Sequence, residues 1–172
     1  MTALANQDTA MPDANAAPVV DVIIEASAWE DQDDAEQVVR KAIETAVAFT
    51  GKPGEIAVLL TDDAAIQQMN AQWRGMDKPT NVLSFPAGEH GAPENVHLGD
   101  IAIACETVAR EAQDDNKTFS DHLAHLAIHG YLHLIGFDHE TDDDAGAMED
   151  LETRILASLA IADPYSDRKA AD

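Results

Sequence analysis

The histidine-rich segment HGYLHLIGFDH, residues 129–139, constrains the fold of this chain more than any other feature. His129 and His133 lie four residues apart, so on an α-helix their imidazoles project from one face, one turn apart. Gly136 permits the left-handed turn that ends such a helix, and the chain can then return far enough for His139 to supply a third nitrogen. The segment therefore predicts a helix that stops at Gly136 and carries the pattern H-x-x-x-H-x-x-x-x-x-H.

This pattern has the ligands of a metal site. Three neutral imidazoles with one open position are typical of catalytic zinc, whereas structural sites usually use four protein ligands. In the comparable motif H-E-x-x-H a glutamate acts as general base, but here Gly130 takes its place, which indicates either room for substrate or close helix packing. We expect one Zn2+ ion, or another divalent transition metal such as nickel or copper, bound by His129, His133 and His139, with water activated by the ion as the simplest nucleophile.

The residues around these ligands have several possible roles. His125 precedes His129 by one helical turn; we favour a contact to a ligand or to the substrate, and assign it to substrate binding, with a polar core contact as the alternative. Asp138 could orient an imidazole, bind a second ion or cap the turn. We expect the remaining histidines to be surface or strand residues: His90, His97 and His122.

A second candidate site lies in NAQWRGMDKPTNVLSFP, residues 70–86. Arg74 and Lys78 place two cations in a loop with glycine and proline, and a guanidinium can bind phosphate oxygens bidentately. Such pairs are usually solvated, but in a chain with only 10 basic residues they are candidates for substrate binding. Trp73 is predicted to be a packing anchor rather than a base-stacking surface. Ser84 and Cys105 fall in predicted strands without a neighbouring base, which argues against nucleophilic roles.

The periodicity of apolar residues predicts strands before helices. Four strands are expected, at 19–26, 56–62, 80–86 and 97–106. Five helices are expected, at 31–50, 63–74, 107–116, 120–135 and 141–160, with Ser120 and Thr141 as N-caps of the last two. This order, with two early helical crossovers, fits an α+β domain with a small mixed β-sheet.

Length and composition indicate one domain. The 172 residues, 45% of them hydrophobic, are enough for one core, which we place at 19–162 between a disordered leader (1–18) and a frayed tail (163–172). The sequence has no secretory signal and no apolar run long enough to span a bilayer, so we expect a cytoplasmic protein without membrane contacts. The single cysteine, Cys105, is compatible with a reducing compartment.

The net charge of −23 limits the kinds of partner. An average field this negative repels a polyanion and argues against strong unaided binding to a phosphate backbone. A local cleft can still be neutral or basic. If the partner is a nucleic acid, a second protein is expected to help deliver it.

Four segments together resemble one family: NAQWRGMDKPTNVLSFP, LGDIAIA, HLAHLAIHGYLHLIGFDH and the following MEDLE helix. They are similar to the YbeY endoribonucleases, the bacterial rRNA maturation factors. The resemblance implies a zincin-like fold and a metal-dependent, single-strand-specific endoribonuclease that acts in ribosomal RNA maturation, notably at the 3′ end of the small-subunit RNA, and in ribosome quality control. By match to the family motif, His129, His133 and His139 would bind zinc and Arg74 would engage the RNA phosphate, with Lys78 assisting. Phe137 stands where tyrosine is common.

Two alternatives remain open at this point. A metal-dependent peptidase or amidase could use the same ion, although the missing glutamate and the nearby arginine disfavour it. A non-catalytic, metal-stabilised protein could bind the ribosome without cutting RNA. The expected partners are single-stranded or ribosomal RNA and a ribosomal protein or other ribosome-associated factor.

Overall fold

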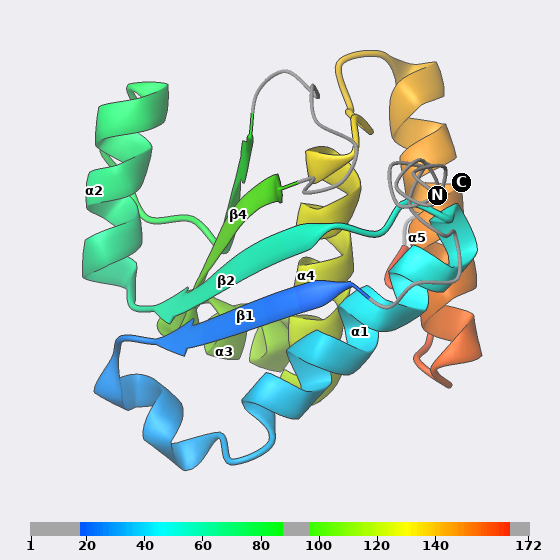
Figure 1. The fold of residues 1–172 in the computed structure, drawn as a ribbon. Coiled ribbons are helices and arrows are strands. Elements are labelled where there is room, and N and C mark those ends of the chain that lie inside the picture. Colours follow the sequence, from blue (N-terminus) through cyan, green and yellow to red (C-terminus); the bar gives the residue numbers. More distant parts are fainter. Residues whose placement is uncertain (1–17, 88–96, 166–172) are drawn as a thin grey trace, which may run out of the picture.

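Four strands form one mixed sheet in the order β1-β2-β4-β3 (Figure 1). In the computed structural model, which describes residues 18–87 and 97–165, their bounds are β1 (Val19–Ile24), β2 (Glu55–Thr61), β3 (Val82–Pro86) and β4 (His97–Ala104). β1, β2 and β4 are parallel, and β3 pairs antiparallel with β4 at the edge. The predicted mixed sheet is confirmed.

Helices cover both faces of this sheet (Figure 1). In the described ranges they are the short 3-10 helix η2 (Ser27–Asp31), α1 (Ala35–Thr50), α2 (Asp63–Arg74), α3 (Cys105–Asp114), α4 (Phe119–Leu134) and α5 (Asp142–Ser158). Helices α1 and α4 pack against each other on one face, with α5 outside them, and α2 lies on the opposite side. The α+β architecture inferred from the order of elements is confirmed.

The core has a large and a small part because the two faces are covered unequally. The larger cluster joins the sheet to α1, α4 and α5, and fully buried residues such as Ile43, Ile101 and Ile128 belong to it. The smaller cluster lies under α2 and consists of Ile66, Leu83, Ala102 and Ala104. Helix α4 is apolar on most of its surface because it lies between the sheet and three other helices, α1, α3 and α5.

The two ends of α4 are fixed by hydrogen bonds. The Thr118 hydroxyl accepts the backbone N–H of Asp121 at 3.0 Å, so Thr118 is the N-cap and the prediction of Ser120 was wrong. At the other end, Gly136 has a φ of +105°, and the N–H groups of Gly136 and Phe137 bond back to the carbonyls of His133 and Leu132 at 3.1 and 3.0 Å. This pair of bonds is a Schellman motif, which confirms Gly136 as the stop.

Three other residues differ from their predicted environments. Cys105 begins α3 and is not part of a strand, because β4 ends at Ala104 although the apolar run continues. Trp73 is 65% exposed, so it is not a packing anchor. His122 is buried, with Nε2 2.8 Å from Glu111 Oε1, and is neither a surface nor a strand residue.

The predicted domain limits are only partly visible. Thr141 caps α5 as expected, since its hydroxyl accepts the Asp144 N–H at 3.0 Å. Asp163 and Tyr165 fall in the predicted tail, yet their side chains bond to Thr153 (3.2 Å) and Glu152 (2.8 Å) on α5. The rest of the tail, nearly all of the predicted leader and His90 lie outside the described residues.

Candidate metal centre

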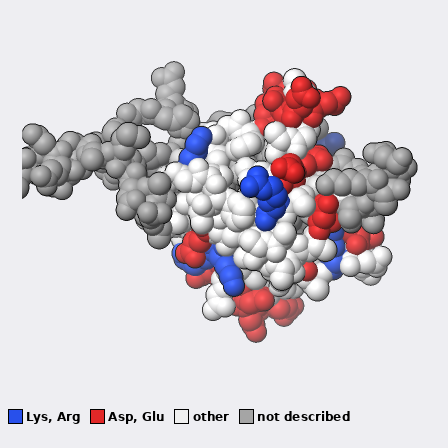
Figure 2. Space-filling view, turned by 90° about the vertical axis from the view of Figure 1, so that its right-hand side faces the viewer, with Lys and Arg blue, Asp and Glu red and all other residues white. Residues whose placement is uncertain are grey.

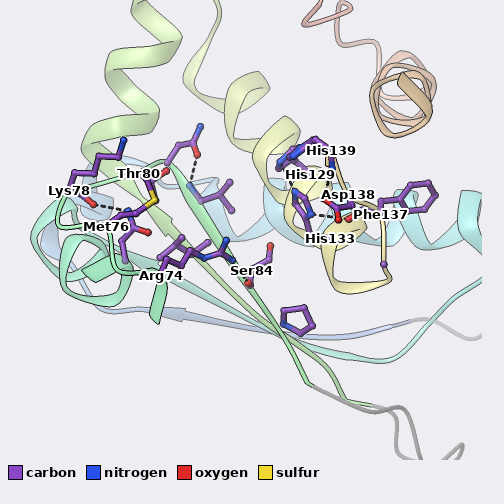
Figure 3. Close-up of a pocket in the computed structure, with 16 residues that line it drawn as sticks. Arg74, Met76, Lys78, Thr80, Ser84, His129, His133, Phe137, Asp138 and His139 are labelled. Carbon is purple, nitrogen blue, oxygen red and sulfur yellow. Dashed lines mark hydrogen bonds between the residues drawn. The ribbon is translucent and has the colours of Figure 1, made fainter. Parts of the chain in front are cut away.

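The three predicted ligands lie together at the end of α4 (Figure 3). Ring centroids are 4.6 Å apart for His129 and His133, 4.6 Å for His133 and His139, and 5.0 Å for His129 and His139. One ligand nitrogen from each ring lies within 4.8 Å of the others. The helix supplies the first two side chains, and the turn at Gly136 carries the third back to them.

Hydrogen bonds decide which nitrogens face the centre. His133 Nδ1 is 2.9 Å from the carbonyl oxygen of Phe137, and His129 Nδ1 is 3.0 Å from Glu152 Oε2. Both partners are acceptors, so each Nδ1 donates a proton and each Nε2 keeps a lone pair. These two Nε2 atoms face each other at 3.1 Å. Two lone pairs at this separation repel unless a cation lies near both, so the donor set fits a metal ion.

Burial keeps the imidazole of His133 neutral, as a metal ligand requires. Burial lowers the pKa of His133 to about 4, and positive charge on His129 or His139 would lower it in the same direction. The Phe137 carbonyl opposes this shift weakly. Near neutral pH the ring of His133 is therefore unprotonated in the metal-free protein.

Glu152 is the candidate site residue that the sequence analysis missed. Its side chain is fully buried on α5 and accepts hydrogen bonds from His125 (3.0 Å), His129 (3.0 Å) and Tyr165 (2.8 Å). Burial alone would raise the pKa of this carboxyl, but the bonds from the two histidines hold it at about 2. An ionised carboxylate in this position fixes the tautomer and orientation of His129.

A signal for Glu152 was present in the helical period of α5. The buried residues of this helix are Met148, Glu152, Ile155 and Leu156, which follow the spacing of a core-facing stripe. An acidic residue in such a stripe needs a buried partner. The surrounding run of exposed acids concealed it.

His125 lies behind the centre rather than in it. Its Nε2 contacts Glu152 and also lies 3.2 Å from the Tyr165 hydroxyl, and burial lowers its pKa. His125, His129 and Glu152 also bring ligand atoms within 4.8 Å of one another. The His129 nitrogen that faces Glu152 is, however, the one that carries a proton, so these three residues form a hydrogen-bonded support. His125 does not line the cavity that contains His129, and its assignment to substrate binding stays a prediction.

The predicted basic residues line the same cavity as the three histidines. This cavity has a volume of about 650 Å³, with the histidines on one side and Arg74, Met76 and Lys78 on the other (Figure 3). Arg74 Nη2 donates to the Ser84 carbonyl at 3.0 Å, and Asn70 Nδ2 donates to the Lys78 carbonyl at 2.9 Å. These bonds attach the guanidinium and the loop to the fold.

The wall around the centre is less acidic than the chain as a whole. Asp138 is the acidic residue of the cavity lining, and its carboxylate accepts the backbone N–H of His139 at 2.6 Å, as expected for a turn cap. Elsewhere acids gather at particular places. On the face shown in Figure 2, which carries α5, one group lies at the upper edge, the level at which α5 begins with Asp142, Asp143 and Asp144, and another lies at the lower edge.

Gly130 and Ser84 have structural roles. A Cβ on Gly130 would lie 3.0 Å from Ile101 Cγ2 and 3.2 Å from Ser84 Oγ, so close packing of α4 on the sheet explains the glycine. Ser84 Oγ donates to the Gly130 carbonyl at 3.0 Å and is buried, which agrees with the prediction that it is no nucleophile.

Fold and site together define a zincin-like α+β domain, the class to which metal-dependent hydrolases with histidine ligands on a helix belong. The profile of the family Endoribonuclease YbeY matches residues 23–160. The chain belongs to the YbeY family of endoribonucleases, as the sequence resemblance implied.

Individual relatives support this assignment over most of the chain. Endoribonuclease YbeY of Rhodopseudomonas palustris strain BisA53 is 53% identical over 162 residues, covering 90% of this chain and 94% of the relative. Endoribonuclease YbeY of Bradyrhizobium sp. strain BTAi1 is 54% identical over 166 residues, covering 90% and 96%. The solution structure of TM1509 from Thermotoga maritima has a TM-score of 0.50 and 26% identity, covering 89% of this chain and 93% of that one.

Within the described ranges, no helix combines the length and apolar character that a membrane crossing requires.

Proposed function

We propose that this chain is a metal-dependent endoribonuclease that cuts single-stranded RNA during ribosomal RNA maturation, at the 3′ end of the small-subunit RNA, and in ribosome quality control. One observation carries the proposal: the histidines of the metal centre and Arg74 line one cavity, although they come from opposite halves of the sequence. Membership of an endoribonuclease family supports RNA as the substrate.

The cofactor in this proposal is a single Zn2+ ion, with His129, His133 and His139 as ligands. Three imidazole nitrogens suit zinc and leave a coordination position open. When bound, zinc supplies Lewis-acid chemistry, by polarising a phosphoryl oxygen and acidifying water. Glu152 and the Phe137 carbonyl keep His129 and His133 in the tautomer that can ligate.

Arg74 acts on the phosphate. Its guanidinium has five N–H donors, so the bond to the Ser84 carbonyl leaves others for phosphoryl oxygens, where negative charge accumulates in the transition state. Lys78 lines the same wall and adds a second positive charge to the substrate site. In this proposal the cations and the metal centre bind opposite sides of one phosphate, which is supported by their position in the lining of one cavity.

The acidic surface suggests assisted delivery of the RNA. A chain with a net charge of −23 gains little from long-range attraction to RNA. A ribosomal protein or another ribosome-associated partner would bring the RNA to the cavity, and this role places the protein in the cytoplasm.

Cleavage of a labelled single-stranded RNA by the purified protein of known zinc content tests the function. We expect cleavage by the wild type and none by His133→Ala or by a chelated sample. Arg74→Ala should cut poorly while retaining its zinc. Equal cleavage in every sample would reveal a contaminating nuclease, and a zinc-loaded wild type that cuts no RNA, with or without ribosomal subunits, would refute the proposal.

A further inference from the structure

An exposed aromatic pair lies beside the cavity of the metal centre. Trp73 is 65% exposed near the end of α2, and its ring meets that of Phe85 on β3 edge to face, with centroids 6.4 Å apart and an interplanar angle of 69°. A tryptophan with this much exposed surface contributes little to the core. It is the most exposed of the large hydrophobic residues in the part of the chain that the structure describes.

The aromatic pair lines a second cavity of about 680 Å³, which continues from the first. Arg74, Ser84 and Pro86 belong to the walls of both cavities. The bond from Arg74 Nη2 to the Ser84 carbonyl therefore lies at the boundary between them, and Figure 3 shows the Arg74 side chain running toward Ser84. A polymer whose phosphate contacts Arg74 can reach the second cavity with an adjoining residue.

The charges of the second cavity favour a base over a phosphate. Besides the two aromatics its lining contains Met69 and the carboxylate of Asp100, which lies on β4 opposite Phe85. An acidic group repels phosphate oxygens, but it can accept a hydrogen bond from the amino group of a base. Aromatic rings and a thioether offer the apolar contacts on which a base stacks.

We propose that Trp73 and Phe85 form a stacking site for an unpaired base of the RNA, next to the phosphate held by Arg74. This inference rests on the proposed function and specifies how the site binds its substrate. A base within a duplex already stacks on its neighbours and pairs with the other strand, so it cannot occupy the cavity without being pulled out. An unpaired base stacks on an aromatic side chain without that cost. The aromatic pair thus contributes to the preference for single strands.

Steady-state cleavage of a short single-stranded RNA tests the stacking site. Loss of one stacked base weakens binding by about 5- to 150-fold, so Trp73→Ala should raise KM by that factor and change kcat less. Trp73→Phe, which keeps an aromatic ring, should recover most of the affinity. Phe49→Ala serves as the control, because Phe49 is an exposed aromatic on α1 that lines neither cavity and should leave KM unchanged.

Abasic substrates separate stacking from a purely structural role of Trp73. An abasic nucleotide is placed in turn at each position flanking the cut. At one position the abasic nucleotide should raise the KM of the wild type by the same factor as Trp73→Ala raises it for the intact RNA. At that position the abasic nucleotide should not raise the KM of Trp73→Ala any further. Additive losses at every position, or an unchanged KM for Trp73→Ala, would overturn the proposal and would favour a protein partner for this aromatic surface.

Tryptophan fluorescence keeps this inference apart from the proposed function. The chain has two tryptophans, and Trp29 is buried, with its indole N–H donating to the Thr61 carbonyl. A change in emission when RNA is added therefore comes mainly from Trp73. A single-stranded oligonucleotide should quench the emission of the wild type but not that of Trp73→Phe. Quenching without cleavage would refute the nuclease activity but support the stacking site. Cleavage without quenching would support the nuclease activity and refute the stacking site.

Discussion

His129 donates a hydrogen bond to Glu152 through Nδ1 at 3.0 Å, while its Nε2 lies 3.1 Å from Nε2 of His133. One contact between α4 and α5 thus determines which nitrogen of the ring faces the metal centre. The carboxylate keeps its charge at full burial because His125 and Tyr165 donate to it as well.

Replacing Glu152 with glutamine should weaken zinc binding by about 10- to 100-fold. A neutral amide accepts a weaker hydrogen bond from His129 and also brings N–H donors against groups that are themselves donors. Competition with a chromophoric zinc chelator measures the change. Asp150→Asn, at an exposed position on the same helix, is the matched control and should bind zinc like the wild type. Unchanged affinity in a cooperatively folding Glu152→Gln protein would contradict the orienting role.

The shape of the Arg74 side chain should matter as well as its charge. Arg74→Lys keeps the cation but loses the planar fork that binds two phosphoryl oxygens, so we expect kcat to fall, though less than in Arg74→Ala. For the alanine variant a loss of about 100- to 1,000-fold is the scale for removing one transition-state donor. Single-turnover cleavage at saturating RNA measures both. Arg154→Ala, at an exposed position on α5, is the control.

Acid should destabilise the metal-free protein below about pH 6.5. The pKa of His133 is about 4 in the folded state, against an ordinary value of 6.5, so between these values the unfolded chain binds more protons than the folded one. The free energy of unfolding must then fall as the pH decreases from 6.5 to 4. Urea titrations at pH 7, 5.5 and 4.5 follow this decrease, and His133→Gln should show a shallower one. If the free energy of unfolding fell equally with pH in both proteins, titratable groups other than His133 would be responsible.

Two glycines on different helices should respond oppositely to alanine. Gly130→Ala brings a methyl group to 3.0 Å from the buried side chain of Ile101, and overpacking of this kind costs about 1–3 kcal/mol. Gly146 lies inside α5, and a Cβ there would meet nothing within 4 Å beyond its own stretch of helix among the described residues, so Gly146→Ala should stabilise by about 0.5–1 kcal/mol through helix propensity. Denaturant midpoints compare the two variants. If Gly146→Ala were less stable than the wild type, the intrinsic helix propensity of alanine would not determine stability at this position.

Local periodicity was sufficient to predict most of the fold. Strands and helices follow the spacing of apolar residues because each element buries one side against the same core. The errors lie at boundaries: Thr118 and Ser120 are both good N-caps, and only the geometry of the chain before α4 selects the first. The continuing apolar run hid the change from β4 to α3 at Cys105.

In the candidate site, too, features set by local sequence were predictable and contacts between distant segments were not. The three histidines were predictable because they lie within eleven consecutive residues, on a helix and the turn that follows it. Contacts between distant segments were not predictable, and this applies to the bond from Glu152 to His129 and to the burial of His122 against Glu111. The exposure of Trp73 was missed for the same reason, because it depends on how α2 packs over β3 and β4.

The position of Glu152 on the final helix has a consequence for the order in which the protein matures. During synthesis α4 emerges before α5, so a nascent chain presents all three histidines while the carboxylate that orients His129 has not yet been made. Docking of α5 supplies that carboxylate and completes the larger core in one event. For the proposed metal site, tight metal capture is thereby coupled to completion of the fold. A chain truncated after α4 and the turn at His139 would retain the three proposed ligands yet lack the carboxylate that orients His129.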